Sequence, residues 1–503
     1  MSKPNHIVIV GGGTAGWMAA NLMAQAWQSQ GIKITVIEST RIGTIGVGEG
    51  STPYLRQFFH RLNIPEAEWM PACHATFKCG ISFPDWSTNK GYENYFHPFY
   101  SMIDAPNAPL FFENCSYRRQ GSDVFAHPND FFVTSKLAQA KKSPIAATPP
   151  RKPVEYGYHF DAELLGQYLA KKALEKGVNH IDDKVLSVET IADGSISHLI
   201  TENSGELHAD FFVDCSGFSG LLIQQTLGEK ITSKKGYLKC DSAVALPTPL
   251  NLQNNVPSET VSKALKYGWV WNIPLTKRFG NGYVYCSDYI SKAEAEAELR
   301  QHLGMENSDA KAVHLHWQPG RLENHWRKNC VAIGLSQGFL EPLEAPMLYL
   351  VQRTTENFIA YFQHENFNSD LKTRFNREIN LLIDGTVDYL QAHYKANTRD
   401  DSQFWIDCRE NTCMSPSLSA ILSGWDESRN FEMVMQEQAN TQVYQRASWY
   451  CLLAGMGRFK PISEADNNVN KNRAEQNHQN ANQDCTAQSE VFIAHNEHLR
   501  TMT

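Results

Sequence analysis

The residues that most constrain the fold lie near the N-terminus, where a β-branched run leads into a glycine-rich turn. Residues 7–10 (IVIV) are typical of a strand, residues 11–16 (GGGTAG) of a tight turn, and residues 17–28 of a helix. A second β-branched run, residues 34–37, ends at Glu38. Strand, glycine turn, helix, strand and acid in this order indicate a dinucleotide-binding βαβ unit. We therefore expect an α/β protein with a Rossmann-like sheet; the weaker alternative is a glycine turn of purely structural use.

Each part of this unit has a physical role. Gly11 permits the tight turn, Gly13 lets the backbone approach a pyrophosphate, and Gly16 lets the helix pack on the strand. The helix N-terminus carries a partial positive charge that favours phosphates. Glu38 lies 22 positions beyond Gly16, a spacing suited to a ribose hydroxyl. The predicted nucleotide contacts here are Gly11, Gly13, Thr14, Ala15, Gly16 and Glu38.

FAD and NAD share this fingerprint, so later segments must decide between them. A second glycine-rich loop covers residues 46–52, and apolar strands end in glycine at residues 212–217 and 331–334. These segments resemble the later nucleotide-contacting elements of the p-hydroxybenzoate-hydroxylase-like flavoproteins, the flavin monooxygenase fold. The resemblance implies FAD as cofactor, with further contacts from Gly48, Glu49, Asp214, Gly334 and Leu335. Since no second G-x-G-x-x-G occurs, a separate NAD(P)H-dependent flavin reductase would have to reduce the flavin.

Composition excludes several other classes of protein. The chain has 503 residues, 20% charged residues and a net charge of −8, without a basic block that would suit nucleic acid. The 11 cysteines are scattered and form no C-x-x-C pair, and His314 and His316 share a strand face without a third ligand, so we predict no metal site. No apolar run reaches spanning length and no signal-peptide pattern is present, which predicts a cytoplasmic protein without membrane contact.

The order of these patterns predicts the domain organisation. Residues 1–365 would form an FAD-binding, monooxygenase-type domain, with substrate-region insertions at about 52–150 and 236–320 that contain a mixed sheet. Apolar periodicity predicts a helical region over 366–460 that covers the substrate. Residues 461–503 would be a polar tail with a short terminal helix, poorly ordered over 467–483, where Asn and Gln dominate. A homodimer is compatible with the sequence, which leaves the oligomeric state open.

Residues 269–274 (WVWNIP) narrow the function. A W-x-W alone places both indoles on one strand face and is most often a core strand. The full W-x-W-x-I-P string resembles the signature of the flavin-dependent halogenases, the tryptophan halogenase family. There this segment lies beside the flavin and keeps the organic substrate away from it, which implies that Trp269 and Trp271 form a barrier. The resemblance runs, with gaps, from residue 7 to about residue 460.

A lysine in residues 77–83 (FKCGISF) is the first candidate for chemistry. Alternation would put Phe77, Cys79, Ile81 and Phe83 on one strand face and Lys78 on the other. Alternation alone favours a solvated edge lysine. The resemblance implies instead that Lys78 is catalytic: it takes hypohalous acid released near the flavin, by hydrogen bonding or as a haloamine, and presents the halogen to the substrate.

Two glutamates in residues 339–344 (FLEPLE) offer carboxylates near the start of a helix. Glu341 is most simply a first-turn acid that favours the helix dipole. Glu344 matches the family glutamate that lies close to the catalytic lysine, so the resemblance implies that Glu344 polarises the halogenating species or removes the arene proton.

The chain departs from the family directly after Glu344. Tryptophan halogenases usually carry a small hydroxylated pair and a glycine here, and their backbone amides help to hold chloride. This chain has Ala345, Pro346 and Met347, so one amide donor and the hydroxyl are missing. We predict a halide site at these three residues that retains the Met347 amide and favours bromide over chloride.

Substrate contacts are predicted from two aromatic segments. Residues 96–99 (FHPF) resemble the family segment whose His and Phe flank the indole, which implies His97 and Phe99; from the residues alone, a His beside Pro is more often a loop residue. Trp449 and Tyr450 are pocket residues or, equally, core residues. The family residues that bind the amino-acid group of tryptophan have no match here, so the predicted substrate is an indole or phenol-like arene.

Together these patterns predict an FADH₂-dependent halogenase that oxidises halide with O₂ at the flavin and transfers halogen through Lys78 to an electron-rich aromatic such as tryptophan or another indole. One alternative is an aromatic hydroxylase on the same fold, which would need direct access of the substrate to the flavin. The other is a flavin-binding paralogue without halogenase turnover, which Ala345, Pro346 and Met347 favour.

Overall fold

The glycine fingerprint lies at the centre of a six-stranded sheet. The computed structural model describes residues 3–43, 48–148, 150, 152–364, 371–462 and 468–502. β1 (His6–Val10) leads into α1 (Thr14–Trp27) and pairs in parallel with β2 (Lys33–Glu38) and with β13 (Phe211–Asp214). The strand order is β22-β23-β13-β1-β2-β9, in which β22 alone is antiparallel. The remaining strands are β9 (Asn179–Asp182), β22 (Trp326–Arg327) and β23 (Cys330–Ala332).

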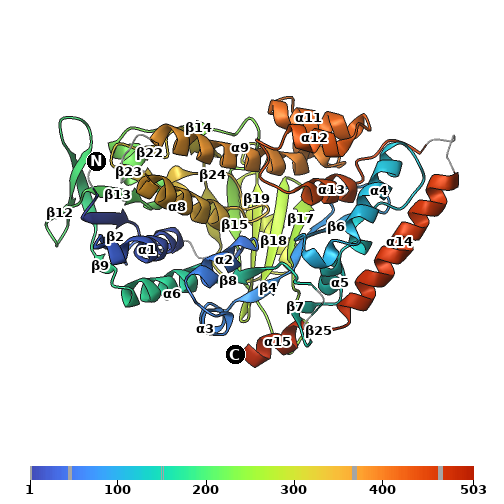
Figure 1. Cartoon of the computed structure of the whole chain (residues 1–503), viewed down its shortest axis with the longest axis horizontal. Helices are drawn as coiled ribbons and strands as arrows, with labels where there is room; N and C mark the ends of the chain where they lie inside the picture. The colour runs from blue at the N-terminus through green and yellow to red at the C-terminus, as the bar shows by residue number, and fades with distance from the viewer. Residues whose placement is uncertain are drawn as a thin grey trace.

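Alternating side chains bury both faces of this sheet. Ile7 and Ile9 face α1, α6 (Ala162–Glu175) and α8 (Met347–His364), which pack together on one side (Figure 1). Val8 and Val10 face the other side, which is covered by a small antiparallel sheet of β10 (Val185–Thr190), β11 (Ile196–Thr201) and β12 (Glu206–His208). Strands buried on both faces explain the continuous apolar runs in the sequence.

Two segments that lie far apart in the sequence form a second, eight-stranded sheet. Its order is β20-β15-β19-β18-β17-β5-β6, with β16 paired to β19, and its yellow-green strands lie at the centre of the molecule (Figure 1). β17 pairs in parallel with β5, and this pair joins the two segments. The strands are β5 (Gly80–Pro84), β6 (Asn94–Pro98), β15 (Ser242–Ala245), β16 (Thr248–Pro249), β17 (Thr260–Leu265), β18 (Gly268–Pro274), β19 (Arg278–Tyr285) and β20 (Val313–His316). α7 (Lys292–Leu303) packs on β15 and β19.

The strand predicted over residues 77–83 is in fact two strands in two sheets. β4 (Thr76–Lys78) pairs with β8 (Gly157–Phe160), which also pairs with β3 (Glu49–Gly50), whereas β5 belongs to the eight-stranded sheet. The break falls at Cys79, whose N–H donates to the carbonyl of Ser258 at 2.7 Å. All side chains from Phe77 to Phe83 are buried, so alternation does not separate a core face from a solvated one.

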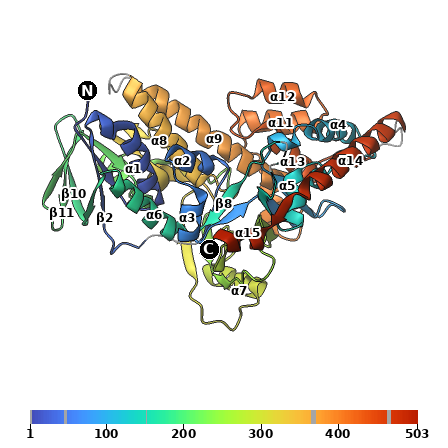
Figure 2. The same ribbon diagram turned by 60° about the horizontal axis from the view of Figure 1, so that its bottom comes forward.

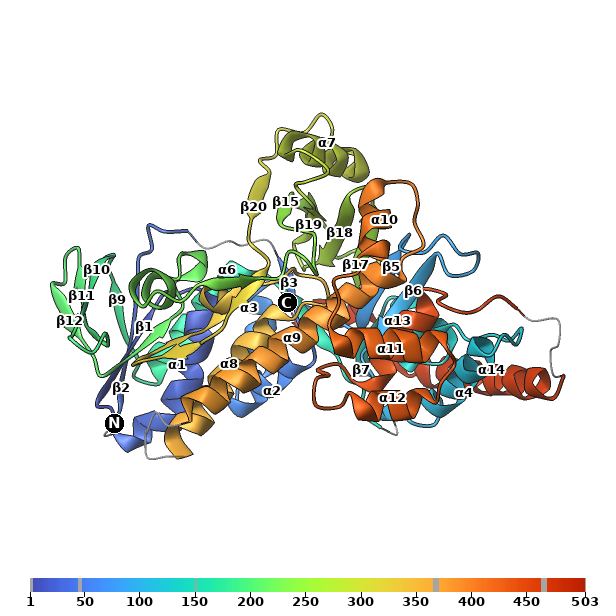
Figure 3. The same cartoon turned by 90° about the horizontal axis from the view of Figure 1, so that it is seen from above.

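Helices follow the sheets from residue 347, so the helical part begins before the predicted region of 366–460. α8 and the long α9 (Lys372–Ala396) run side by side across the molecule (Figure 3). The C-terminal half of α9, from Gly385 onward, is buried. It is followed by α10 (Gln403–Glu410), α11 (Pro416–Asp426), α12 (Phe431–Glu437) and α13 (Arg446–Gly455). The predicted boundary between residues 365 and 366 lies outside the described residues.

The prediction of a poorly ordered connection over 467–483 is wrong for the described part, residues 468–483. These residues lie in α14 (Asn468–Ser489), which packs along α4 (Ala108–Arg119) and α5 (Val133–Gln139) (Figures 1 and 2). Its buried residues recur every three or four positions: Ala474, Asn477, Ala481 and Cys485. Because this stripe is made of small and polar side chains, composition hides its helical period.

The chain ends in a short strand and a short helix, as the prediction of a terminal helix required. β25 (Phe492–Ala494) pairs with β7 (Lys142–Ala146), and α15 (His495–Met502) follows. Two further helices, α2 (Tyr54–Arg61) and α3 (Glu66–Ala72), lie between the glycine-rich loop and β4. Among the described residues, no helix combines the length and apolar character needed to span a bilayer.

Candidate active site

Lys78 ends β4 and lies in the interior rather than at a solvated edge. Its side chain is 1% exposed, and its Nζ lies 5.5 Å from the centre of the Phe99 ring. Among the described residues, no carboxylate lies within 4 Å of Nζ and no group forms a hydrogen bond with it. Burial lowers the pKa of Lys78 to about 8, although Glu344 acts in the opposite direction. The neutral amine is therefore easier to reach near neutral pH than for a solvated lysine.

Gly50 leaves the space that the Lys78 amine uses. A Cβ at residue 50 would lie 3.2 Å from Lys78 Nζ and 3.5 Å from Thr260 Oγ1. Thr260 belongs to a directed chain of hydrogen bonds: Thr76 donates to the Pro274 carbonyl at 2.6 Å, and the His159 ring links Thr76 to Thr260 at 3.0 and 2.9 Å. Because Thr76 has a single proton, His159 must donate through Nδ1 and accept through Nε2. These hydrogen bonds connect β4, the strand that contains Lys78, to Pro274 at the end of β18.

Glu344 lies in the turn before α8 and is 4% exposed. Its backbone has φ 66° and that of Ala345 has φ 52°, two successive left-handed residues without a glycine. Such conformations store strain and occur mainly where the surrounding structure enforces them. His393 of α9 contacts Glu344 Oε1 through Nε2 at 3.0 Å. Burial opposes ionisation of Glu344, but His97, His393 and Lys78 together hold its pKa below the usual value.

An aromatic cluster adjoins these charged groups. His97 of β6 is 3% exposed, and its Nε2 lies 2.7 Å from the hydroxyl of Tyr389, which donates to the Ser448 carbonyl. Burial lowers the pKa of His97. Trp449 meets the Tyr389 ring edge-on at 5.0 Å. The structure thus brings three predicted substrate residues, His97, Phe99 and Trp449, near Lys78 or Tyr389.

Tyr450 is placed elsewhere. It packs against Phe112 and Phe431, with ring centres 4.4 and 5.1 Å away, and its hydroxyl donates to Glu432. Neighbouring residues on a helix point about 100° apart, so α13 directs Trp449 towards Tyr389 and Tyr450 towards α4 and α12. Of the two readings open for Tyr450, core packing is the one that the structure favours.

Both tryptophans of the W-x-W segment are buried on the same face of β18. Trp269 is 1% and Trp271 5% exposed, and both belong to the main core, whereas Val270 packs on the opposite face. Trp269 Nε1 donates to the Tyr394 hydroxyl at 3.1 Å, and that hydroxyl lies 2.9 Å from a Glu341 oxygen. Glu341 is therefore a buried interior acid rather than an exposed first-turn residue, and burial raises its pKa to about 8.

In the predicted nucleotide-binding turn, glycines stand at positions where a side chain would clash with neighbouring backbone. A Cβ at Gly11, which has φ 111°, would lie 2.2 Å from the Cys215 carbonyl oxygen, and one at Gly16 would lie 2.0 Å from the Gly11 carbonyl oxygen. The Glu38 carboxylate faces the turn beside Gly12. The first turn of α1 contains no acid that would repel a phosphate. These features fit a dinucleotide.

The other predicted nucleotide residues lie in two places. Gly334 and Leu335 lie beside the glycine turn, and Gly48 and Glu49 lie in the segment before α2. Gly334 has φ 84° and lies against Ala15 at the start of α1, with part-buried Leu335 next to it. Gly48 has φ 76°; Glu49 is partly buried, and burial together with Asp161 raises its pKa to about 7. Residues 46 and 47 of this loop lie outside the described residues.

The Asp214 side chain is bound within the protein. It is fully buried, and its carboxylate accepts hydrogen bonds from the N–H groups of Ser216, Leu222 and Ile223 at 2.8–3.0 Å. Its oxygens are therefore occupied by the loop that follows β13, and the residue shapes that loop.

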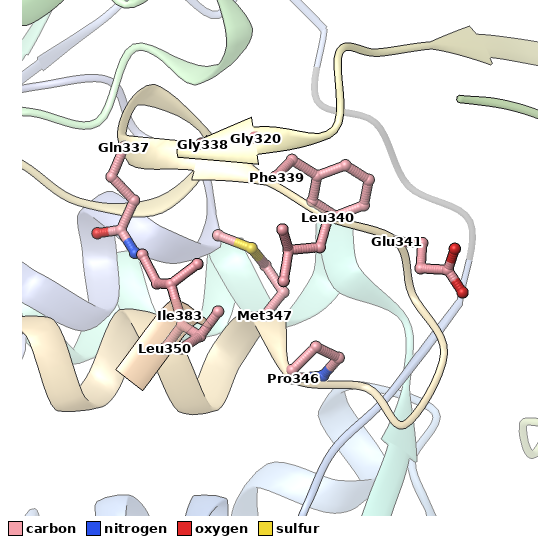
Figure 4. A pocket seen from close by; sticks show the side chains of 10 residues that line it. All are labelled: Gly320, Gln337, Gly338, Phe339, Leu340, Glu341, Pro346, Met347, Leu350 and Ile383. Atoms are coloured by element: carbon pink, nitrogen blue, oxygen red, sulfur yellow. The ribbon is translucent and has the colours of Figure 1, made fainter. Parts of the chain in front are cut away.

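Two of the three predicted halide residues, Pro346 and Met347, border a small hollow between the loop after β24 (Gly338–Phe339) and α8. Pro346 and Met347 line it together with Leu340, Glu341 and Ile383, and the Glu341 carboxylate points away from Met347 and Leu350 (Figure 4). The Ala345 N–H already donates to the Pro342 carbonyl at 2.9 Å. Of residues 345–347, only Met347 therefore keeps an amide without a backbone partner among the described residues.

Sequence reasoning missed four site residues: His159, Tyr389, His393 and Tyr394. None lies in a recognisable motif. Tyr389, His393 and Tyr394 lie in α9, where the apolar period predicts burial but does not indicate a functional site. A usable signal is that polar residues 389, 393 and 394 recur at helical spacing within this buried stretch. Among the described residues, no group of three or more His, Cys, Asp or Glu side chains could hold a metal ion.

Comparison with known proteins places this geometry in context. Residues 6–468 match the family model for tryptophan halogenase. The chain is 36% identical to tryptophan 6-halogenase SttH of Streptomyces toxytricini, over 84% of each chain, and 35% identical to 7-chloro-L-tryptophan 6-halogenase KtzR of Kutzneria sp. (strain 744), over 99% of each. It is also similar to the solved structure of BrvH, a flavin-dependent halogenase from Brevundimonas sp. BAL3, with a TM-score of 0.85, 30% identity and 99% coverage of both chains.

Proposed function

The chain belongs to the tryptophan halogenase family and is a flavin-dependent halogenating enzyme; from this premise we propose that it uses FADH₂, O₂ and halide to halogenate an electron-rich aromatic, such as tryptophan or another indole. We also propose that Lys78 delivers the halogen and that a separate NAD(P)H-dependent flavin reductase supplies reduced flavin. The predicted cytoplasmic location suits such a reductase.

One observation carries the proposal: a buried lysine and a buried glutamate that influence each other's pKa lie in the interior with an aromatic cluster beside them. Lys78, Glu344 and His97 come from β4, the turn before α8, and β6, and each is less than 5% exposed. A buried amine whose pKa is about 8 is a better nucleophile than a solvated lysine. Structural use alone gives no reason to bury a lysine without an ion pair.

The residues of the glycine turn fit FAD. Gly11, Gly13, Gly16 and the N-terminus of α1 would receive the pyrophosphate, and Glu38 would accept a ribose hydroxyl. The bound flavin supplies the oxidation of halide by O₂. The protein itself would separate and position the reactants. Trp269 and Trp271, both buried on β18, would obstruct direct contact between the aromatic substrate and the flavin.

Glu344 is suited to accept the proton that the aromatic ring loses. Its pKa is held below the usual value by neighbouring His97, His393 and Lys78, so it is an ionised base at neutral pH. His97, Phe99 and Trp449 supply ring faces for a flat substrate.

A second candidate function, a flavin-binding protein without halogenase turnover, is favoured by the segment after Glu344. The Ala345 N–H already donates to the Pro342 carbonyl, and Pro346 has no N–H, so few donors remain for a halide. An aromatic hydroxylase is disfavoured, because Trp269 and Trp271 would block the access of substrate to the flavin that hydroxylation requires.

The deciding experiment is incubation with reduced FAD, O₂, bromide or chloride and a panel of indoles and phenols, read by mass spectrometry. Halogenated product supports the proposal, hydroxylated product the hydroxylase, and FAD binding with peroxide release alone the paralogue. Lys78→Ala should abolish product while FAD binding and peroxide release continue, and Glu344→Gln should slow halogenation by about 10²–10⁴. The matched control is Lys263→Ala, which removes a partly exposed lysine of β17 that pairs with Asp85, and it should leave turnover unchanged.

A further inference from the structure

The buried His393 ring lies between two hydrogen-bond acceptors. Its Nδ1 lies 3.0 Å from the backbone carbonyl oxygen of Tyr389, one helical turn earlier in α9, and its Nε2 lies 3.0 Å from Glu344 Oε1. A carbonyl oxygen can only accept, so Nδ1 carries a proton. An ionised carboxylate can also only accept, so Nε2 must then carry a second proton. The pair therefore holds one proton more than a carboxylate and a neutral imidazole would.

The surroundings decide where that extra proton resides. His393 is 0% exposed, and the ring centres of Phe83 and Trp86 lie 5.0 and 6.1 Å away. A buried carboxylate without a charged partner is costly, so an ionised Glu344 favours a cation beside it. The groups that face Glu344 or His393 from other elements are Lys78 of β4, Tyr95 and His97 of β6, and Tyr444 before α13; Tyr389 lies on α9 itself. Burial raises the pKa of Glu344, but His97 and Lys78 act with the hydrogen bond from His393 to hold it below the usual value. The carboxylate is therefore the ionised partner, and we infer that the extra proton resides on His393.

We propose that His393 is a positioning residue that carries an imidazolium charge, neutralises Glu344, and thereby lets Lys78 lose its proton more readily than it would beside an unbalanced carboxylate. This inference rests on the proposed function of Lys78, and His393 itself acts through Glu344. Without a cation at residue 393, the charge of Glu344 would be balanced by Lys78, and an opposite charge holds an amine in its ammonium form. With the cation in place, the carboxylate is satisfied and the lysine can keep a lone pair for an electrophilic halogen.

Nuclear magnetic resonance can test this assignment without flavin, halide or turnover. In chain labelled with [¹⁵N]histidine, the ring of His393 should show two protonated nitrogens at pH 7. In Glu344→Gln the carboxylate is gone, so the same ring should show one. In chain labelled with [¹³Cε]lysine, the titration midpoint of Lys78, identified by its loss in Lys78→Met, should rise by about one pH unit in His393→Gln.

The matched control is His325→Gln. His325 is also fully buried, but its Nε2 contacts the neutral amide of Asn380 at 3.0 Å, so its loss should leave the Lys78 midpoint unchanged. A single protonated nitrogen in wild-type His393, or an unchanged Lys78 midpoint in folded His393→Gln, overturns the proposal. If His393→Gln does not fold, the histidine spectra of the wild type and Glu344→Gln still decide it. Absence of halogenated product would instead count against the proposed function.

Discussion

At the scale of single residues, the position of the Lys78 amine depends on residue 50 being a glycine, which has no side chain. We expect Gly50→Ala to displace Nζ, because the new Cβ would lie 3.2 Å from it in a tightly packed interior. A reacting group moved by a fraction of an ångström lowers the rate, here by on the order of tenfold. Single-turnover halogenation by chain loaded with reduced FAD measures the effect.

Gly43→Ala is the control for this substitution. A Cβ at residue 43 would meet nothing within 4 Å, so the same chemical change should leave the rate unaffected. FAD affinity, measured by fluorescence quenching, should be similar in both variants. Equal halogenation rates for the two variants would show that Gly50 does not determine the position of Lys78.

At the scale of elements, the turn between Glu344 and α8 should determine the choice of halide. Chloride is more strongly hydrated than bromide and needs better donors in the protein to replace its water. Pro346 lacks an N–H and the Ala345 N–H is bound to Pro342. We therefore expect bromination to exceed chlorination clearly at equal halide concentrations, as measured by isotope patterns in the product.

Restoring donors in this turn should move the preference towards chloride. Pro346→Thr returns an N–H and a hydroxyl, and we expect a larger chlorinated share in the same competition. Predominantly chlorinated product from the wild type would mean that the present turn already builds a competent chloride site, and the explanation based on missing donors would fail.

The helix α14 offers a prediction about stability. Ala481 is 0% exposed against α4 and α5, so Ala481→Glu would bury an unpaired charge and overfill the contact. We expect a loss of about 3 kcal/mol in the free energy of unfolding. Ala487→Glu places the same side chain at an exposed position of the same helix and should change stability by less than about 0.5 kcal/mol. Thermal or urea unfolding that gives equal values for both would contradict the packing of α14.

At the scale of the whole molecule, one nucleotide-binding unit serves a large substrate region. The sequence contains a single G-x-G-x-x-G, and it follows β1 of the six-stranded sheet. We therefore expect the purified chain to bind FAD but not to oxidise NADH unaided, as followed by absorbance at the nicotinamide band. Adding a flavin reductase should start NADH consumption; robust oxidation by the chain alone would require a second nucleotide site.

The sequence by itself determined the elements whose physical causes are local. The glycine turn, the parallel strands and the helices after residue 347 could be predicted because backbone conformation and apolar period are written in neighbouring residues. The W-x-W-x-I-P, F-K and L-E-P-L-E segments also identified the family, and with it Lys78 and Glu344 as candidates. The sequence could not show that residues 77–83 divide between two sheets, because strand pairing depends on distant partners.

Tertiary structure decided everything that depends on which distant residues meet. His159 and His393 belong to no motif, yet pairing of β4 with β8 and packing of α9 bring them to Lys78 and Glu344. Tertiary contacts also make Tyr450 a core residue and direct the Asp214 carboxylate to the loop after β13. They bury one stripe of α14 despite its polar composition. The physical reason is common to all of these: burial and hydrogen-bond partners are properties of contacts across the fold, whereas sequence patterns report only local preference.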